Sequence, residues 1–317
     1  MSVRVGLVGA GAVGARHARV LAGFADVELL GIADPVPGAA RALADSTGAP
    51  VVPVAELLAA RPDGVWLCVP PFAHGELEVQ VVAAEVPFFT EKPLAADLAT
   101  AVQVAALVAA SGLPTATGYH WRHLDTVAAA RAELAGRVPR LVAARWWGGT
   151  PPPAWWRDPA RSGGQLVEQA THVLDLVRVL AGEVDEVVGA AAASTHDDRG
   201  VPDATAAVLR MASGAVGSVS TSCVLPGPTA AGLDVVADDL VVQLTETSLS
   251  VRDRGRDEQR TPAVDPRVAV DRAFVDVLAG GVPAAGLVDV AEALRTHRLA
   301  WALAEATRTG STVRVAR

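Results

Sequence analysis

Short apolar runs alternate with segments of helix length through the first 118 residues of the chain. This alternation is typical of a parallel sheet covered by helices on both faces, because every strand is then buried on both sides. The predicted strands are Val3–Val8, Val27–Ala33, Val65–Val69, Val86–Thr90 and Thr115–Gly118. Residues 1–120 are therefore predicted to form a doubly wound α/β domain.

The pattern changes after Tyr119, where strand-like runs dominate and two helices close the chain. The charged run at 252–260 is expected to be a solvated loop. Residues 121–317 are thus predicted to form a second, α+β domain with an antiparallel sheet. Its expected strands are Leu141–Trp147, Val187–Ala193, Thr205–Met211, Val216–Ser222, Leu233–Val236, Leu240–Leu244 and Ser248–Val251.

A G-x-G-x-x-G pattern lies between the first predicted strand and the first predicted helix. In this context the helix N-terminus offers N–H groups and a positive dipole end to a pyrophosphate. Asp34 stands 20 positions beyond Gly14, at the end of the second strand. A carboxylate there accepts hydrogen bonds from ribose hydroxyls and repels a 2′-phosphate, so a Rossmann domain that binds NAD rather than NADP is predicted. The alternative is a Rossmann-like domain that binds no dinucleotide. The predicted cofactor contacts here are Gly9, Gly11, Ala12, Val13, Gly14 and Asp34.

Lys92 is the only lysine of the chain, and it directly follows the strand predicted over Val86–Thr90 in an E-K-P motif. The carboxyl ends of strands in an open parallel sheet face the ligand crevice. A lysine there can donate a hydrogen bond to a substrate oxygen and stabilise developing alkoxide charge. The alternative is a surface lysine with a solvated head. Glu91, Lys92 and Pro70, all at strand ends, are also predicted to contact the cofactor.

A single helix predicted over Gln165–Ala181 places Glu168, His172 and Asp175 on one face. A carboxylate within reach of a histidine fixes its tautomer and raises its pKa, which suits a general acid/base. The alternative is the water-facing stripe of an ordinary amphipathic helix. A metal pair is a poor third interpretation, because no cysteine or histidine cluster accompanies these residues, and no metal is expected.

Four motifs then occur in a specific order: the glycine loop, the E-K-P motif, the Gly118–Arg122 segment and the glycine-rich start of the helix with His172. In these motifs the chain resembles the Gfo/Idh/MocA (glucose–fructose oxidoreductase/inositol dehydrogenase) family across nearly its full length. The resemblance implies a Rossmann domain followed by a domain with an open, mostly antiparallel sheet. It also implies sugars, inositols or related polyols as substrates.

The resemblance also assigns roles to residues. Lys92 matches the family lysine, and His172 matches the histidine that usually serves as general acid/base. Glu168 falls where the family commonly has an aspartate, so the carboxylate is kept but is one methylene longer. These three residues are the predicted catalytic group for NAD(P)-dependent hydride transfer between nicotinamide and a secondary alcohol or ketone. The candidate substrate contacts are Tyr119, His120, Arg122, Trp155, Trp156, Arg157 and His172.

Two other functions remain open from the sequence. One is an enzyme that keeps NAD tightly bound and oxidises its substrate transiently, for glycoside cleavage or sugar oxidoreduction. The other is a non-catalytic sensor that binds the dinucleotide.

The charge and composition of the chain limit the binding partners and the cellular compartment that can be expected. The formal net charge of -8 argues against a general nucleic-acid binder. No apolar run reaches about 18 residues, so no membrane span is expected, and no signal peptide is evident. Cys68 and Cys223 lie in separate apolar runs, which predicts buried thiols in a reducing cytoplasm. The open sheet face of the second domain predicts a homodimer or homotetramer.

Overall fold

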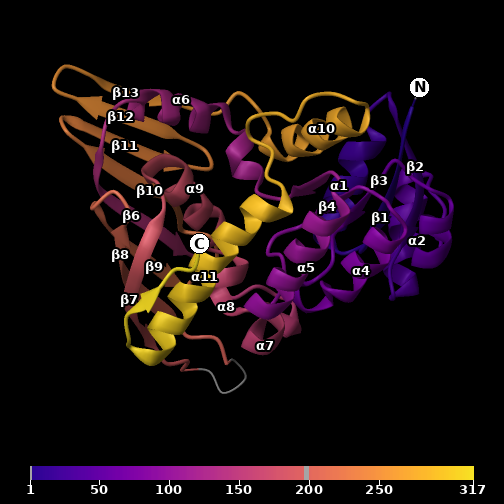
Figure 1. Cartoon of the computed structure of the whole chain (residues 1–317), viewed down its shortest axis with the longest axis horizontal. Helices are drawn as coiled ribbons and strands as arrows, with labels where there is room; N and C mark the ends of the chain where they lie inside the picture. Colours follow the sequence, from indigo (N-terminus) through magenta and orange to yellow (C-terminus); the bar gives the residue numbers. More distant parts are fainter. Residues whose placement is uncertain (1, 196–199) are drawn as a thin grey trace. The chain divides into compact units, whose positions relative to one another are not determined.

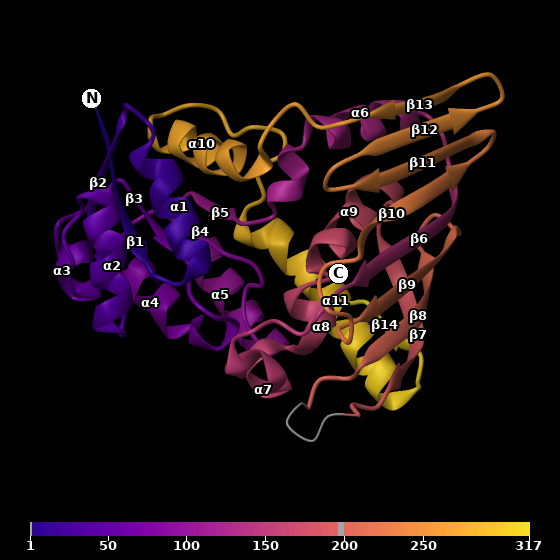
Figure 2. The ribbon, with the colours of Figure 1, turned by 180° about the vertical axis from the view of Figure 1, so that it is seen from behind.

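The structure is a computed structural model that describes residues 2–195 and 200–317, and its chain divides into two compact units (Figures 1 and 2). The chain passes from unit 1 to unit 2 after His120. The expected second domain, residues 121–317, included Pro266–Leu294, but the structure groups this segment with unit 1. Unit 1 comprises Met1–Ala95, Ala99–His120 and Pro266–Leu294, and unit 2 comprises Ala96–Leu98, Trp121–Asp265 and Arg295–Arg317.

Unit 1 is built on a five-stranded sheet with the order β2-β1-β3-β4-β5, in which every pair is parallel. The inner strands are almost entirely buried because helices cover both faces, so the predicted doubly wound sheet is confirmed. The strands are β1 (Val3–Val8), β2 (Val27–Ala33), β3 (Gly64–Leu67), β4 (Phe88–Thr90) and β5 (Thr115–Thr117). The helices are α1 (Ala12–Ala22), α2 (Pro37–Thr47), α3 (Val54–Ala59), α4 (Glu76–Ala83), α5 (Leu98–Ser111) and α10 (Pro266–Leu278).

Helix α10 joins unit 1 because its apolar side chains complete the core of that unit. Phe274 is fully buried, and its ring lies 5.3 Å from the Trp66 ring, centroid to centroid. Trp66 on β3 stacks in turn against Phe89 on β4 at 5.8 Å. Burial of aromatic rings of this size contributes roughly 2–3 kcal/mol each. The sequence pattern alone does not reveal this contact, because α10 lies far along the chain from the sheet it covers.

Unit 2 is built on a nine-stranded sheet with the order β13-β12-β11-β10-β6-β9-β8-β7-β14. All neighbouring pairs are antiparallel except β6 and β9, so the predicted mostly antiparallel sheet is confirmed. The strands are β6 (Pro139–Trp147), β7 (Val184–Ala192), β8 (Ala204–Met211), β9 (Val216–Ser222), β10 (Ala230–Ala237), β11 (Leu240–Thr245), β12 (Leu249–Asp253), β13 (Asp257–Arg260) and β14 (Val313–Arg314). The helices are α6 (Asp125–Leu134), α7 (Pro159–Ser162), α8 (Gly164–Glu168), α9 (Thr171–Ala181) and α11 (Val290–Thr309), which begins in the last segment of unit 1.

The two faces of this sheet differ in what covers them. Alternate residues of its strands point into one core, where they pack against α6, α9 and α11 (Figure 2). The opposite face, called the outer face below, exposes apolar side chains. The larger ones on its central strands are Leu141, Val188, Val208 and Val216.

One expectation for the sheet of unit 2 is wrong. The charged run at 252–260 is not a loop, because it supplies the end of β12 and the whole of β13. Its charges pair within the hairpin and with α6, as in the contacts of Arg256 with Glu133 at 2.7 Å and of Arg252 with Asp257 at 3.2 Å. Charged side chains on an edge strand also discourage pairing with other sheets.

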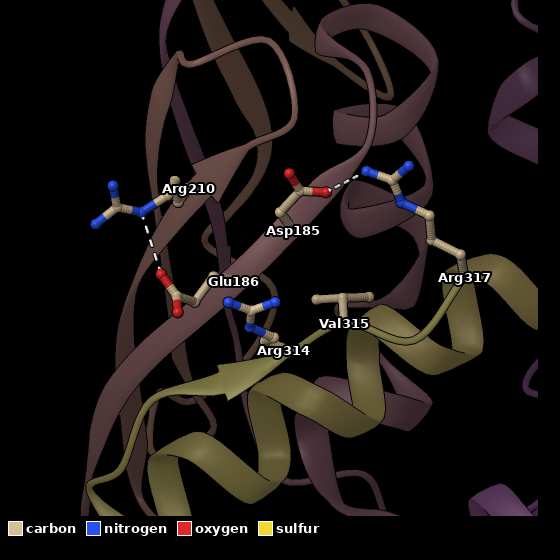
Figure 3. A pocket seen from close by; sticks show the side chains of 6 residues that line it. All are labelled: Asp185, Glu186, Arg210, Arg314, Val315 and Arg317. Atoms are coloured by element: carbon tan, nitrogen blue, oxygen red, sulfur yellow. Dashed lines mark hydrogen bonds and ion pairs between the residues drawn. The ribbon is translucent and has the colours of Figure 1, made fainter.

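The last residues of the chain form a second edge of the sheet that the sequence did not predict (Figure 3). Strand β14 pairs with β7, and the Val315 N–H donates to the carbonyl oxygen of Asp185 at 2.9 Å. Arg317 closes this edge with an ion pair to the Asp185 carboxylate at 2.7 Å. A surface cavity of about 370 Å³ lies beside it.

None of the helices in the described part of the chain is long and apolar enough to cross a membrane.

Candidate functional site

The glycine loop has the geometry that a bound pyrophosphate requires. Gly9 has φ of 99°, and a Cβ there would collide with the carbonyl oxygen of Cys68. A Cβ on Gly14 would collide with the carbonyl oxygen of Gly9, so this glycine is needed for helix α1 to pack against the loop. A Cβ on Gly11, by contrast, meets no atom within 4 Å. The space beside Gly11 is open at the N-terminus of α1, where no side chain caps the helix, and this fits a phosphate group.

Asp34 lies at the end of β2 and touches this loop directly. Its Oδ2 accepts a hydrogen bond from the Ala10 N–H at 2.7 Å, and its Oδ1 accepts one from the Val36 N–H at 2.7 Å. The carboxylate therefore holds the backbone of Ala10 in the glycine loop and the backbone of Val36 in the turn that follows β2. Each oxygen keeps a further lone pair for a ribose hydroxyl.

Asp34→Ala is expected to raise the NADP/NAD ratio of kcat/KM by about tenfold or more, equivalent to about 1.4 kcal/mol. The reason is that the alanine side chain neither repels a 2′-phosphate nor accepts a hydrogen bond from a ribose hydroxyl group. Steady-state kinetics with both cofactors measure the ratio. Asp34→Asn is the matched variant, because its carbonyl oxygen can keep one of the two backbone bonds. An unchanged ratio in both variants would contradict the ribose assignment.

Lys92 follows β4 at the carboxyl end of the sheet, as predicted. The peptide bond between Lys92 and Pro93 is cis. The Lys92 N–H donates to Glu91 Oε2 at 3.1 Å, so the Glu91 carboxylate holds the peptide group of its own neighbour. A Cβ on Gly118 would lie 2.6 Å from this carboxylate, which explains why glycine begins the Gly118–Arg122 motif.

Glu91 itself points into the protein rather than toward open space. Its Oε1 accepts hydrogen bonds from Arg16 at 3.1 Å and from His17 Nε2 at 2.9 Å. Burial alone would raise the pKa of Glu91, but the hydrogen bond and charge of His17, with Arg16 and Lys92, lower it to about 2. This geometry favours an internal structural role for the carboxylate over the predicted direct contact with the cofactor.

His17 lies between two carboxylates from distant segments. Its Nδ1 is 2.7 Å from Asp271 Oδ1 on α10, and its Nε2 faces Glu91. Burial would lower the pKa of His17, but the charges and hydrogen bonds of Asp271 and Glu91 outweigh burial and raise it to about 9. The imidazole is therefore an imidazolium at neutral pH.

The free energy of unfolding is expected to fall as pH rises through about 9. Because the pKa of His17 is raised above its ordinary value of 6.5, its contribution is fully present below pH 6.5 and is lost above the folded pKa. The loss is on the order of 3 kcal/mol. Urea unfolding from pH 6 to pH 10 measures it, with His17→Gln as the comparison. A variant that shows the same alkaline loss as the natural protein would refute the assignment to His17.

In unit 2, the predicted single helix over Gln165–Ala181 is broken into α8 and α9. The Ala170 N–H donates to the carbonyl oxygen of Gln165, five residues earlier, at 2.9 Å. Such a π-type turn is common at functional sites. The Gln165 side chain stabilises the break, because its Nε2 donates to the Ser222 carbonyl oxygen at 2.8 Å and to Gln169 at 3.1 Å. Periodicity cannot reveal this, since the apolar spacing continues across the break.

His172 lies in the first turn of α9 and is buried beside two indole rings. The Trp121 ring is 6.0 Å from the imidazole with an interplanar angle of 13°, and the Trp146 ring is 6.0 Å away with an angle of 25°. Both tryptophans also line a cavity of about 990 Å³, together with Gln169 and Arg145. His172 is thus placed next to the wall of a cavity of the size that small ligands occupy.

Trp156, one of the predicted substrate contacts, packs inside unit 2. Its side chain is fully buried against Val201 and Cys223. Its indole N–H donates to Glu168 Oε2 at 2.9 Å. The structure therefore makes Trp156 the residue that holds the Glu168 carboxylate.

Arg122 and Asp175 form a buried ion pair. Arg122 donates from Nε and Nη2 to the two Asp175 oxygens, both at 2.6 Å. Thr296 on α11 donates to the same carboxylate at 2.9 Å. Asp175 therefore does not face water, as the alternative interpretation of this helix would require, and the guanidinium of Arg122, a predicted substrate contact, binds α9 through this ion pair.

The remaining predicted contacts lie as follows. Tyr119 and His120 are buried in unit 1, whereas Trp155 and Arg157 are partly exposed in the 3-10 helix Ala154–Arg157 of unit 2. Pro70 follows β3 and precedes a second 3-10 helix. Over residues 2–195 and 200–317, no group of three or more His, Cys, Asp or Glu side chains is arranged to hold a metal ion.

Sequence reasoning missed Trp121 and Trp146 beside His172, and Asp271 beside His17. Trp121 lies within the Gly118–Arg122 motif and directly follows the candidate residue His120. This position in the motif was a sequence signal that could have identified it. Trp146 and Asp271 carry no local pattern that marks them. Their partners lie on other elements, so only the fold identifies them.

Two family models match the chain. A model described as an oxidoreductase family with an NAD-binding Rossmann fold, GFO_IDH_MocA, matches residues 3–119. A model of the GFO/IDH/MocA C-terminal domain matches residues 128–249.

Individual relatives agree with these matches. An inositol 2-dehydrogenase of Rhizobium meliloti strain 1021 is 31% identical over 239 residues, which are 70% of this chain and 69% of that protein. A myo-inositol dehydrogenase of Streptomyces leeuwenhoekii is 31% identical over 297 residues, 89% of this chain and 91% of that protein. The crystal structure of the WlbA dehydrogenase from Bordetella pertussis, in complex with NADH and UDP-GlcNAcA, shares the fold with a TM-score of 0.87. It is 22% identical, and the match covers 100% of both chains.

Proposed function

The chain belongs to the Gfo/Idh/MocA family of oxidoreductases with an NAD-binding Rossmann fold, and we propose that its substrate is a sugar, an inositol or a related polyol. The reaction is oxidation of a secondary alcohol to a ketone, or the reverse. The observation that carries the proposal is the position of His172, stacked on two tryptophans that line a cavity of about 990 Å³.

Unit 1 would hold the dinucleotide through the glycine loop and Asp34. The open space beside Gly11 and the uncapped N-terminus of α1 suit the pyrophosphate. Asp34 suits the ribose hydroxyls, since its two oxygens are already oriented by backbone N–H groups. A bound dinucleotide would supply the redox chemistry, as NAD+ for hydride removal from an alcohol carbon and as NADH for hydride addition to a ketone.

The proposal assigns one chemical role to His172 of unit 2 and another to Lys92 of unit 1. His172 takes the hydroxyl proton during oxidation and returns it during reduction. The Lys92 ammonium donates a hydrogen bond to a substrate oxygen and stabilises the negative charge that develops there. Glu168 supplies the carboxylate of the site, with its Oε2 oriented by the Trp156 indole.

The cavity supports the polyol assignment through its chemistry. The partly buried indole ring of Trp146 lines the cavity, where it can pack against the C–H face of a sugar ring. Polar groups of the lining, including Arg145, Gln169 and Thr150, suit hydroxyl groups around that ring. A simple aliphatic alcohol has no further hydroxyl groups to offer these polar side chains, so we expect it to bind less tightly.

A substrate panel tests the proposal. NADH formation at 340 nm is measured with myo-inositol and its stereoisomers, aldoses, sugar acids and nucleotide sugars, and simple secondary alcohols serve as the control. We expect turnover with at least one cyclic polyol and none with the simple alcohols. Preference for a simple alcohol would overturn the substrate class. Turnover without added NAD, with cofactor retained through purification, would instead point to transient oxidation by bound NAD.

We also propose that the outer face of the unit 2 sheet is covered by a second copy of the chain in a cytoplasmic homo-oligomer. Val188 on β7 lies opposite Val208 on β8, and Leu141 on β6 lies opposite Val216 on β9, so the exposed apolar side chains form adjacent rows. A flat face of this kind is suited to a symmetric contact with itself. Cys68 and Cys223 are both buried and are not joined in a disulfide, which fits a reducing compartment.

Val208→Glu is expected to convert the oligomer to a monomer of 32.4 kDa. The reason is that a symmetric contact would bury two carboxylates without partners. Light scattering after size-exclusion chromatography measures the mass. Val282→Glu is the matched control, because Val282 is 89% exposed and lies outside the sheet. A natural protein that elutes as a monomer would refute the assignment.

A further inference from the structure

A cluster of mostly charged side chains, buried except for the partly exposed Arg16, lies next to the Lys92 peptide in unit 1. It consists of Arg16 and His17 on α1, Trp66 on β3, Glu91 after β4, and Asp271 on α10, and it is called the His17 cluster. The side chains of His17 and Asp271 are each 1% exposed. The residues of the proposed reaction do not include His17 or Asp271. Buried ion pairs are costly to assemble, so the cluster calls for an explanation.

The histidine bridges segments that are far apart in the chain. His17 and Asp271 are separated by 254 residues, and His17 and Glu91 by 74. Nδ1 lies 2.7 Å and 2.9 Å from the two Asp271 oxygens, and Nε2 lies 2.9 Å from Glu91 Oε1. The Trp66 indole N–H donates to Asp271 Oδ1 at 2.9 Å.

The geometry favours a doubly protonated ring. A neutral imidazole has one N–H, so one of its nitrogens would direct a lone pair at a carboxylate oxygen less than 3 Å away. The imidazolium donates at both nitrogens and neutralises part of the charge of Asp271 and Glu91. Arg16 supplies a second positive charge to Glu91 at 3.1 Å. Charge and hydrogen bonding thus leave the Glu91 carboxylate little freedom to move.

The restrained Glu91 carboxylate in turn restrains the backbone of Lys92. Its Oε2 accepts the Lys92 N–H at 3.1 Å, while its own N–H donates to the Leu67 carbonyl oxygen at 2.9 Å. The orientation of the Lys92 peptide group therefore depends on where the Glu91 carboxylate lies. His17 is also three residues beyond Gly14 on α1, so the same ring ties the phosphate-loop helix to the strand end that carries the ammonium.

We propose that His17 and Asp271 are positioning residues for the hydride-transfer reaction, which fix the Lys92 peptide, and through it the ammonium, by way of the Glu91 carboxylate. The inference rests on the proposed role of Lys92. A displacement of about 1 Å of a reacting group can lower turnover about a hundredfold. A cluster that merely stabilised the fold would lower stability without acting through Lys92.

A double-mutant cycle separates these two roles. His17→Gln removes the positive charge and one donor, and it is expected to lower kcat by about tenfold to a hundredfold. NADH affinity, measured by fluorescence on the same preparation, is expected to change much less than kcat. In the Lys92→Ala background the same substitution is expected to change kcat by less than about twofold, because there is no ammonium left to misplace.

Asp271→Asn gives the second arm of the cycle and is used alone if His17→Gln does not fold. Its amide has the shape of the carboxylate and keeps the acceptor for Trp66. The expected result is the same dependence on Lys92. Arg272→Gln is the matched control, since Arg272 is the next residue of α10 but forms its ion pair with Asp26 near the surface. It is expected to leave kcat unchanged.

The outcomes are distinct. If Lys92→Ala alone retains turnover, the proposed role of Lys92 fails, and the positioning role fails with it. If Lys92→Ala is impaired but the His17 or Asp271 substitution lowers kcat by the same factor in both backgrounds, the positioning role is overturned while the proposed function stands. Unchanged kcat in folded His17→Gln or Asp271→Asn enzyme overturns it equally.

Discussion

The Lys92→Ala enzyme is expected to turn over about 10²- to 10³-fold more slowly than the natural protein while binding NADH nearly as well. Lys92 is proposed to stabilise charge that develops on the substrate oxygen only during the reaction. Its loss should therefore lower kcat and kcat/KM together. Stopped-flow measurement of hydride transfer and fluorescence titration of NADH give the two quantities. Retained turnover with a verified substrate would remove Lys92 from the mechanism.

The composition of the chain offers a control that most enzymes lack. Lys92 carries the only lysine ε-amine in the sequence. Reductive methylation therefore modifies this side chain and the α-amino group alone, and substrate should protect Lys92 from modification. Lys92→Arg keeps a positive charge but replaces a compact ammonium by a planar guanidinium, so we expect it to restore little activity. Recovery of full activity would show that any cation suffices.

The His172→Asn enzyme is expected to lose about 10²- to 10⁴-fold in kcat, the range for removal of a general acid/base. Asparagine is similar in size and polar, but it cannot exchange a proton near neutral pH. The pH profile of kcat should lose the limb that the imidazole contributes. Turnover and the thermal midpoint are measured together, so that loss of folding is separated from loss of chemistry.

Trp146→Phe provides the matched comparison for this variant. It keeps an aromatic ring beside His172 but reduces its area, and Trp146 also lines the cavity. We expect it to raise KM for the polyol more than it lowers kcat. If His172→Asn retained the natural kcat, proton transfer would have to be assigned to another group.

The parts of the fold that follow from local patterns were predictable. The parallel sheet of unit 1 follows from apolar strands alternating with helices, and the glycine loop follows from the spacing of Gly9, Gly11 and Gly14 with Asp34. The position of Lys92 at a strand end was predictable for the same reason. The strands of unit 2 alternate clearly enough between apolar and polar residues to predict most of them.

The parts that depend on distant partners were not predictable. The break between α8 and α9 depends on the Gln165 side chain reaching the Ser222 carbonyl oxygen. The burial of Asp175 depends on Arg122 and Thr296. A helical repeat shows which residues share a face, but it does not show whether a polar residue on that face meets water or an ion-pair partner.

The return of the chain to its first unit bears on how the protein matures during translation. The sheet strands of unit 1 are complete once β5 has been made, whereas α10 follows roughly 150 residues later, on the order of ten seconds of ribosomal synthesis. Until then Trp66 lacks its Phe274 neighbour, and the imidazole of His17 lacks its Asp271 counterion. Unit 1 therefore stays incomplete during translation until the long middle segment of unit 2, Trp121–Asp265, has been synthesised.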